Sequence, residues 1–81
     1  MAVIWERREE AFLAVATGPA GEVRFYLIVE PIGDHWDWAV WCPRMDQWAV
    51  CEDAKGTVQE AMREAEWVAG ANFLIPARTE Q

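Results

Sequence analysis

The chain has 81 residues, of which 53% are hydrophobic and 26% are charged, and its formal net charge is −7. This length and composition are typical of one folded domain, residues 1–81, and exclude an intrinsically disordered chain. The acidic balance excludes the basic surface that sequence-independent binding of nucleic acid requires, so nucleic acid is a disfavoured partner.

No apolar run approaches the length of a transmembrane helix. The charged residues 6–10 lie where a signal peptide would need its apolar segment. We therefore expect a soluble, cytoplasmic protein that does not bind membranes. In that compartment Cys42 and Cys51 are expected to be reduced thiols.

Two interpretations fit the N-terminal segment. Residues 2–16 contain Ala, Glu, Arg and Leu, which favour a helix. The apolar residues nevertheless cluster on both sides of a charged turn, which favours two short strands, with the second over residues 12–17. Strand composition between turn signals then predicts three more strands, over residues 23–30, 36–42 and 48–52.

A helix is predicted over residues 57–70. Thr57 and Glu60 have the spacing of a capping box, in which each side chain bonds the backbone N–H of the other residue. Apolar residues then recur at a helical period. They are Val58, Ala61, Met62, Ala65, Val68 and Ala69. Pro76 favours a flexible, non-helical tail over residues 76–81.

Together these elements predict an α+β fold. We expect an antiparallel meander of four strands (three to five, depending on the N-terminal segment), with one C-terminal helix packed on one face.

Four of the six tryptophans lie between residues 35 and 53. Because alternate residues of a strand share a face, Trp36 and Trp38 are expected in the core under the helix. Trp48, together with Val50, is expected beside them, and Trp41 on the opposite face. The same assignment places Cys42 and Cys51 on opposite faces of the sheet, which would exclude a disulfide between them.

The face away from the helix is the predicted binding surface. Tyr26, Ile28 and Trp41 are its candidate contact residues, with Ala39 and Ala49 between them. The alternative is that a chain terminus covers this face. Trp67 is a further candidate, because it lies on the polar side of the helix; either residues 73–75 pack against it, or it forms a recognition spot with Leu74.

The residues give no support for catalysis. His35 lies near Asp34 and Asp37, as an acid–base pair or a weak metal site requires, but a lone histidine beside Gly33 is typical of a hairpin turn. The two cysteines lack zinc-type spacing, and the chain contains no serine. Glu60, Glu64 and Glu66 are expected on the solvent side of the helix. We therefore expect no enzyme activity, no metal and no cofactor.

Six residues carry a resemblance to small uncharacterised bacterial and prophage-associated proteins. The motifs are Gly-x-x-Trp-x-Trp in a strand and Thr-x-x-Glu-Ala at the start of a helix. The matching residues are Gly33, Trp36, Trp38, Thr57, Glu60 and Ala61. This resemblance implies a fold but no activity.

A weaker resemblance is to the domain of HicB-type antitoxins, which also has an acidic meander leading into a Gly-x-Thr-x-x-Glu-Ala helix. Gly56, Thr57, Glu60 and Ala61 match that helix. The chain has Pro43-Arg44-Met45 in place of the Pro-Asp-Leu-x-Gly signature, and we expect no DNA-binding tail.

The sequence thus favours a small acidic protein-interaction module: an adaptor, an inhibitor or a self-associating domain. Its partner would be another protein or a second copy of the chain. The alternatives are a small-ligand or single-stranded nucleic-acid binder that stacks its exposed aromatics, and an antitoxin-like domain.

Overall fold

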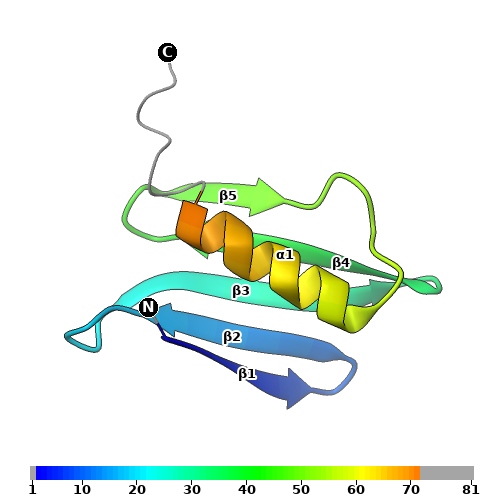
Figure 1. Cartoon of the computed structure of the whole chain (residues 1–81), viewed down its shortest axis with the longest axis horizontal. Coiled ribbons are helices and arrows are strands. Elements are labelled where there is room, and N and C mark those ends of the chain that lie inside the picture. Colours follow the sequence, from blue (N-terminus) through cyan, green and yellow to red (C-terminus); the bar gives the residue numbers. More distant parts are fainter. Residues whose placement is uncertain (1, 72–81) are drawn as a thin grey trace, which may run out of the picture.

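The computed structural model describes residues 2–71, which form five antiparallel strands and one helix (Figure 1). The strands are β1 (Ala2–Arg8), β2 (Ala11–Thr17), β3 (Val23–Ile32), β4 (His35–Cys42) and β5 (Gln47–Val50), and the helix is α1 (Val58–Ala71). They lie side by side in chain order, as a meander. The predicted α+β class is confirmed, and residues 2–8 form a strand, not a helix. The predicted tail, 76–81, lies outside the described residues.

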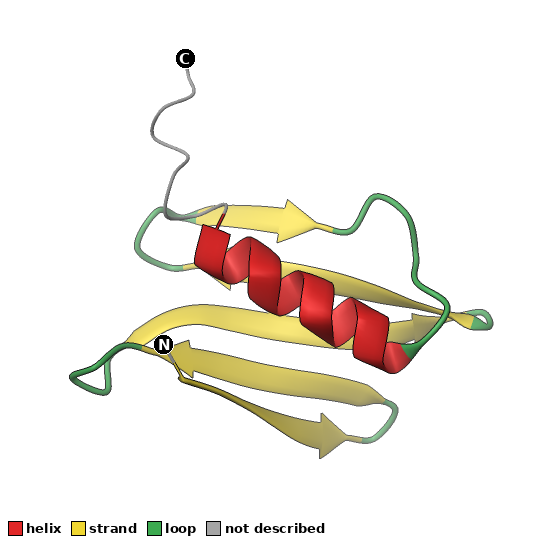
Figure 2. Ribbon diagram, in the orientation of Figure 1, coloured by secondary structure: helices red, strands yellow, loops and turns green. Residues whose placement is uncertain are grey.

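The fold has two layers. Figure 2 shows α1 lying across one face of the sheet, over β3 and β4. Three alanines of α1 (Ala61, Ala65 and Ala69) are fully buried against that face, because a methyl side chain lets helix and sheet approach closely. The shortest dimension of the fold, 17 Å, suits one sheet and one helix. We call the sheet face away from α1 the outer face.

The predicted capping box starts the helix. The Thr57 hydroxyl oxygen accepts from the backbone N–H of Glu60 at 3.1 Å, and the Thr57 backbone N–H donates to Glu60 Oε1 at 3.2 Å. These bonds satisfy two of the donors that the first turn of a helix leaves unpaired.

The core lies between α1 and the strands below it. Every second residue of β3, from Phe25 to Val29, is buried, as are Trp38 and Val40 of β4. Trp36 is half-buried and packs at the edge of this core beside Phe12. The predicted core positions of Trp36 and Trp38 are therefore confirmed.

The prediction for Trp48 is wrong. Residues 43–46 connect β4 to β5, and Cys42 pairs with Gln47. Because four residues connect the two strands, each even-numbered residue of β5 lies opposite an odd-numbered residue of β4. Trp48 therefore pairs with Trp41. Because paired residues share a face, Trp48 and Val50 lie on the outer face, while Ala49 and Cys51 lie on the helix side.

The predicted separation of the two cysteines is also wrong. Cys42 and Cys51 both lie on the helix side, because the register of β5 differs by one residue from the predicted one. They remain free thiols. The backbone N–H of Cys51 bonds the carbonyl of Trp38, which is four residues before Cys42 on β4. That offset is about 13 Å along a strand, too far for a disulfide.

Within residues 2–71, no helix combines the length and the apolar composition that crossing a membrane requires.

We predict that Ala65→Leu lowers the free energy of unfolding by about 1–3 kcal/mol. Ala65 is fully buried under α1, so the larger side chain would push the helix away from the sheet. The matched control is Arg63→Leu at an exposed position of the same helix, which should change stability by less than about 0.5 kcal/mol. Urea unfolding followed by circular dichroism measures both, and equal effects would contradict the close packing of helix and sheet.

Candidate functional site

The outer face presents two rows of residues that cross the sheet, and every residue in them except Glu6 is apolar or aromatic. In the first row, each strand contributes one residue, and each residue pairs directly with the next. This row is Ile4, Val15, Tyr26, Trp41 and Trp48. The second row lies two residues further along each strand. It is Glu6, Leu13, Ile28, Ala39 and Val50.

These rows remain open to solvent in the described chain. Ile4 is 77% exposed, Trp48 is 62% exposed and Val50 is 63% exposed. Monomeric proteins rarely leave a contiguous apolar surface of this kind uncovered unless it binds something. No described element lies over the outer face, since α1 packs on the other side and residues 2–8 extend the sheet at its edge.

The structure brings three of the four predicted contact residues together. Tyr26 and Trp41 are paired in the first row, and Ile28 lies in the second. Tyr26 is exposed, whereas Ile28 and Trp41 are half-buried. Trp48, which the sequence-based interpretation placed in the core, belongs to this surface instead. Its ring lies 5.0 Å from that of Trp41, tilted by 41°.

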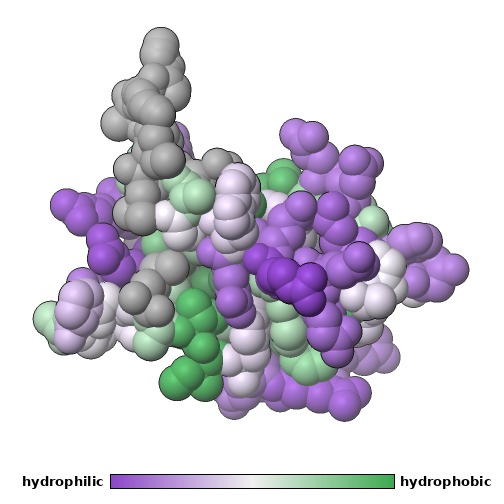
Figure 3. All heavy atoms as spheres, viewed as in Figure 1, coloured by the Kyte–Doolittle hydropathy of each residue, from purple (hydrophilic) through white to green (hydrophobic). Residues whose placement is uncertain are grey.

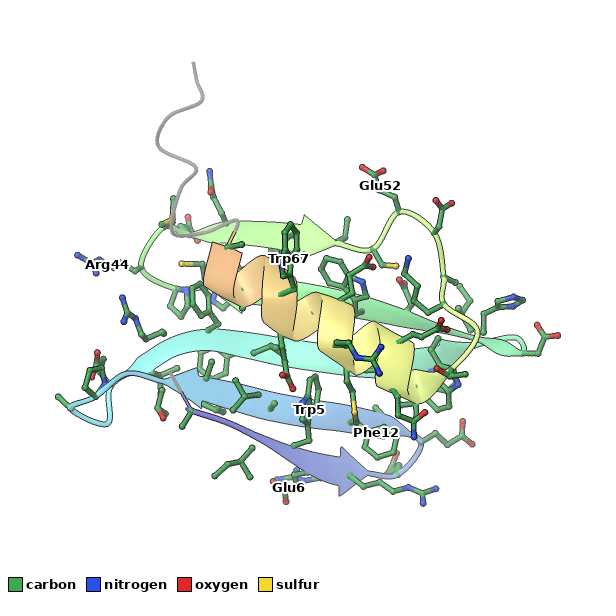
Figure 4. All side chains as sticks on the ribbon, viewed as in Figure 1. Trp5, Glu6, Phe12, Arg44, Glu52 and Trp67 are labelled. Atoms are coloured by element: carbon green, nitrogen blue, oxygen red, sulfur yellow. The ribbon has the colours of Figure 1, made fainter. Side chains whose placement is uncertain are left out.

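Trp67 does not belong to this surface. It is 65% exposed on α1, so it lies on the helix side of the sheet, where Figure 4 shows it pointing away from the core. Residues 73–75, which were expected either to cover it or to extend it, lie outside the described residues. Hydrophilic residues predominate on the helix-bearing face, with smaller apolar areas between them (Figure 3).

Two glutamates of α1 bind tryptophans of the sheet, contrary to their predicted solvent positions. The indole N–H of Trp38 donates to Glu64 Oε1 at 2.7 Å, and that of Trp5 donates to Glu66 Oε2 at 2.6 Å. Figure 4 shows Trp5 on the helix-bearing side of β1. The two glutamates lie about 200° apart around the helix axis, so these bonds hold α1 from both flanks. We call them the indole clamps.

Electrostatics strengthen the clamp at Glu64. Lys55 Nζ lies 3.2 Å from Glu64 Oε1, and the backbone of Lys55 is fixed by two hydrogen bonds to Trp36. The hydrogen bond from Trp38, and then Lys55, lower the pKa of Glu64, and together they outweigh its partial burial, which raises it. The hydrogen bond to Glu64 in turn raises the pKa of Lys55.

The polar candidates assemble no catalytic or metal centre. His35 is exposed at the start of β4, next to the turn from β3, and its Nδ1 lies 2.8 Å from Asp34 Oδ1. Asp37 instead accepts the backbone N–H of Trp38. Burial and the nearby Asp37 raise the pKa of the Cys51 thiol, which disfavours the reactive thiolate. Residues 2–71 contain no group of three or more His, Cys, Asp or Glu side chains placed to hold a metal ion.

A shallow groove on the helix side is lined by two half-buried aromatics, Phe12 and Trp36. It lies beside the start of α1, where the rings of Phe12 and Trp36 are 6.1 Å apart and the guanidinium of Arg7 lies 5.9 Å from the Phe12 ring. The cation therefore already occupies one aromatic face. Sequence analysis missed this groove because its residues come from five elements, β1 to β4 and α1.

Comparisons with protein-family models, curated proteins and solved structures found no match. The two resemblances suggested by the sequence motifs therefore stay predictions, and the function has to be inferred from the geometry.

We predict that Glu64→Gln lowers the free energy of unfolding by about 1 kcal/mol at pH 7, because a neutral amide accepts a weaker hydrogen bond and loses the ion pair with Lys55. The folded pKa of Glu64 lies below its ordinary value of 4.5. The stability from its charge is therefore fully present above that value and is lost as the pH falls through the folded pKa.

The difference between wild type and Glu64→Gln should thus shrink between about pH 5 and about pH 3. The control is Glu52→Gln, an exposed carboxylate outside the clamps. Chemical unfolding at a series of pH values measures both variants, and a difference that does not depend on pH would contradict the clamp.

Proposed function

We propose that this chain is a protein-interaction module that binds another protein surface through its outer face. The observation that carries the proposal is the first apolar row, in which five paired residues cross the whole sheet and three of them are large aromatics. Aromatic residues are enriched at the centres of protein interfaces, where they bury much surface at a small entropic cost.

The shape and charge of the outer face support a protein partner over a small ligand or a nucleic acid. The face is one side of an open sheet, whereas small-ligand sites are concave. Single-strand binders combine stacking aromatics with a positively charged groove, but this chain has a net charge of −7. Trp41 and Trp48 also contact each other, which limits the ring surface available for stacking.

The best test is site-specific photo-crosslinking in the cells that produce the chain. We predict that benzoylphenylalanine in place of Tyr26 yields conjugates with protein. The same group in place of Arg63, on the exposed side of α1, should yield few. Trp48→Asp should then abolish the conjugates formed at position 26, because a buried, unpaired carboxylate is costly at an interface.

Trp67→Asp is the matched control, since Trp67 is 65% exposed and Trp48 is 62% exposed. The proposal requires Trp67→Asp to leave the conjugates unchanged. Equal labelling from positions 26 and 63, or no protein conjugate at position 26, would contradict it. Conjugates with nucleic acid at position 26 would also contradict it and would support the stacking alternative.

A further inference from the structure

We infer that the partner of the outer face is a second copy of this chain, packed face to face so that the two sheets form a β-sandwich. This inference rests on the proposed function and names its partner. The carrying observation is a size gradient along the first row. Its residues on β1 and β2 are branched aliphatics, Ile4 and Val15, and its residues on β3, β4 and β5 are aromatics.

A two-fold axis can bring the large end of this row in one copy over the small end of the same row in the other copy. A two-fold axis parallel to β3 places β1 of one copy over β5 of the other and β2 over β4. Ile4 then meets Trp48 of the second copy, Val15 meets Trp41, and Tyr26 meets its own equivalent. In the second row, by the same symmetry, Leu13 meets Ala39, Ile28 meets its own equivalent, and Glu6 meets Val50 at the edge. Each contact near the centre thus combines a large side chain with a smaller one, or two equal ones.

The other face-to-face arrangement has its two-fold axis along the rows and places each strand over its own equivalent. With that axis on the first row, Trp48 would face Trp48 and Ile4 would face Ile4, which leaves voids because packed sheets keep a nearly constant separation of about 10 Å. With that axis midway between the rows, Trp48 would face Val50 and Trp41 would face Ala39 of the second copy. Both axes keep the strands aligned, as is common in β-sandwiches. Only the axis parallel to β3 brings position 15 over position 41, and we assign the dimer to it because it matches the size gradient of the first row.

The outer face is large enough for a weak, reversible dimer. Five strands span about 24 Å and the paired segments run for about 20 Å, which gives a flat area of about 480 Å². Stable interfaces of standard size bury roughly 800 Å² on each partner, and smaller ones are typical of weak, transient association. The dimer is therefore expected to form at micromolar to millimolar concentration.

Charge gives this dimer a distinctive salt dependence. Glu6 is the only charged residue in the two rows; it lies on the edge strand β1, and its carboxylate is paired with Arg8 at 3.1 Å. Apolar burial therefore holds the copies together, while the net charge of −7 on each chain keeps them apart. Salt screens that repulsion. The dimer should therefore tighten as salt increases, whereas binding to a basic partner would weaken.

The decisive experiment uses size-swap variants of the full chain. Val15→Trp places two large side chains at each contact between positions 15 and 41, and Trp41→Val places two small ones there. Each variant alone should weaken dimerisation at least about tenfold. Mixing the two variants restores one large and one small residue at both symmetry-related contacts, so the mixture should form heterodimers with close to wild-type affinity.

Analytical ultracentrifugation from micromolar to millimolar concentration, at about 50 mM and about 500 mM salt, measures these affinities. Circular dichroism confirms that each variant is folded, and Trp67→Val is a control that should dimerise as wild type does. Positions 15 and 41 lie on strands separated by β3, so rescue in the mixture cannot arise within one chain.

Three results would overturn the inference: a wild-type chain that stays monomeric at millimolar concentration, a dimer that weakens with salt, and a mixture that dimerises no better than its components. If the chain is monomeric but position 26 crosslinks to a different protein, the second-copy inference fails and the proposed function stands. If the chain is monomeric and position 26 crosslinks to no protein, both fail.

Discussion

One helix can cover only one face of this sheet, and the other features of the molecule follow from that constraint. A helix of 14 residues is about 21 Å long and about 10 Å wide, while five strands span about 24 Å. The helix side of the sheet is therefore buried beneath alanines and a few larger residues. The outer face keeps Tyr26, Trp41 and Trp48 without any described element to cover them.

The indole clamps attach the narrow helix to both sides of the broader sheet. Trp5 and Trp38 reach α1 from β1 and β4, on either side of the central strands. Their apolar rings widen the layer that α1 alone would form, and Glu66 and Glu64 accept the N–H groups that would otherwise be left unpaired at partly buried positions. Two tryptophans thus complete the helix side, which leaves Trp41 and Trp48 to form the aromatic part of the outer face.

The sequence predicted the fold well because its signals are local. Strand composition, turn residues, the capping box at Thr57 and the helical period of the alanines each depend on neighbours in the chain, and all of these predictions are confirmed. The position of Trp48 was predicted wrongly because Trp48 and Val50 are more apolar than Ala49 and Cys51, so composition alone favours them as core. The register across the loop 43–46 decides otherwise, and only the parity of the loop length carries that information in the sequence.

The clamps were beyond prediction for a different reason. Residues 5 and 66 are close only because β1 forms the edge of the sheet and α1 crosses the sheet in a particular direction. On the sequence, Glu64 and Glu66 have the pattern of solvated helix residues. Their role depends on which indoles the sheet places beside them, and a helical wheel contains no such information.

The central claim is that Trp48 lies on an open apolar face that meets a second copy, and ¹⁹F NMR of the chain labelled with 5-fluorotryptophan tests it most directly. The solvent isotope shift of each signal reports exposure. In dilute solution, Trp48 and Trp67 should be accessible and Trp38 protected. As concentration rises, Trp48 should become protected while Trp67 stays accessible. A Trp48 signal as protected as that of Trp38 at every concentration, or one that stays accessible at the highest concentration, would contradict the account.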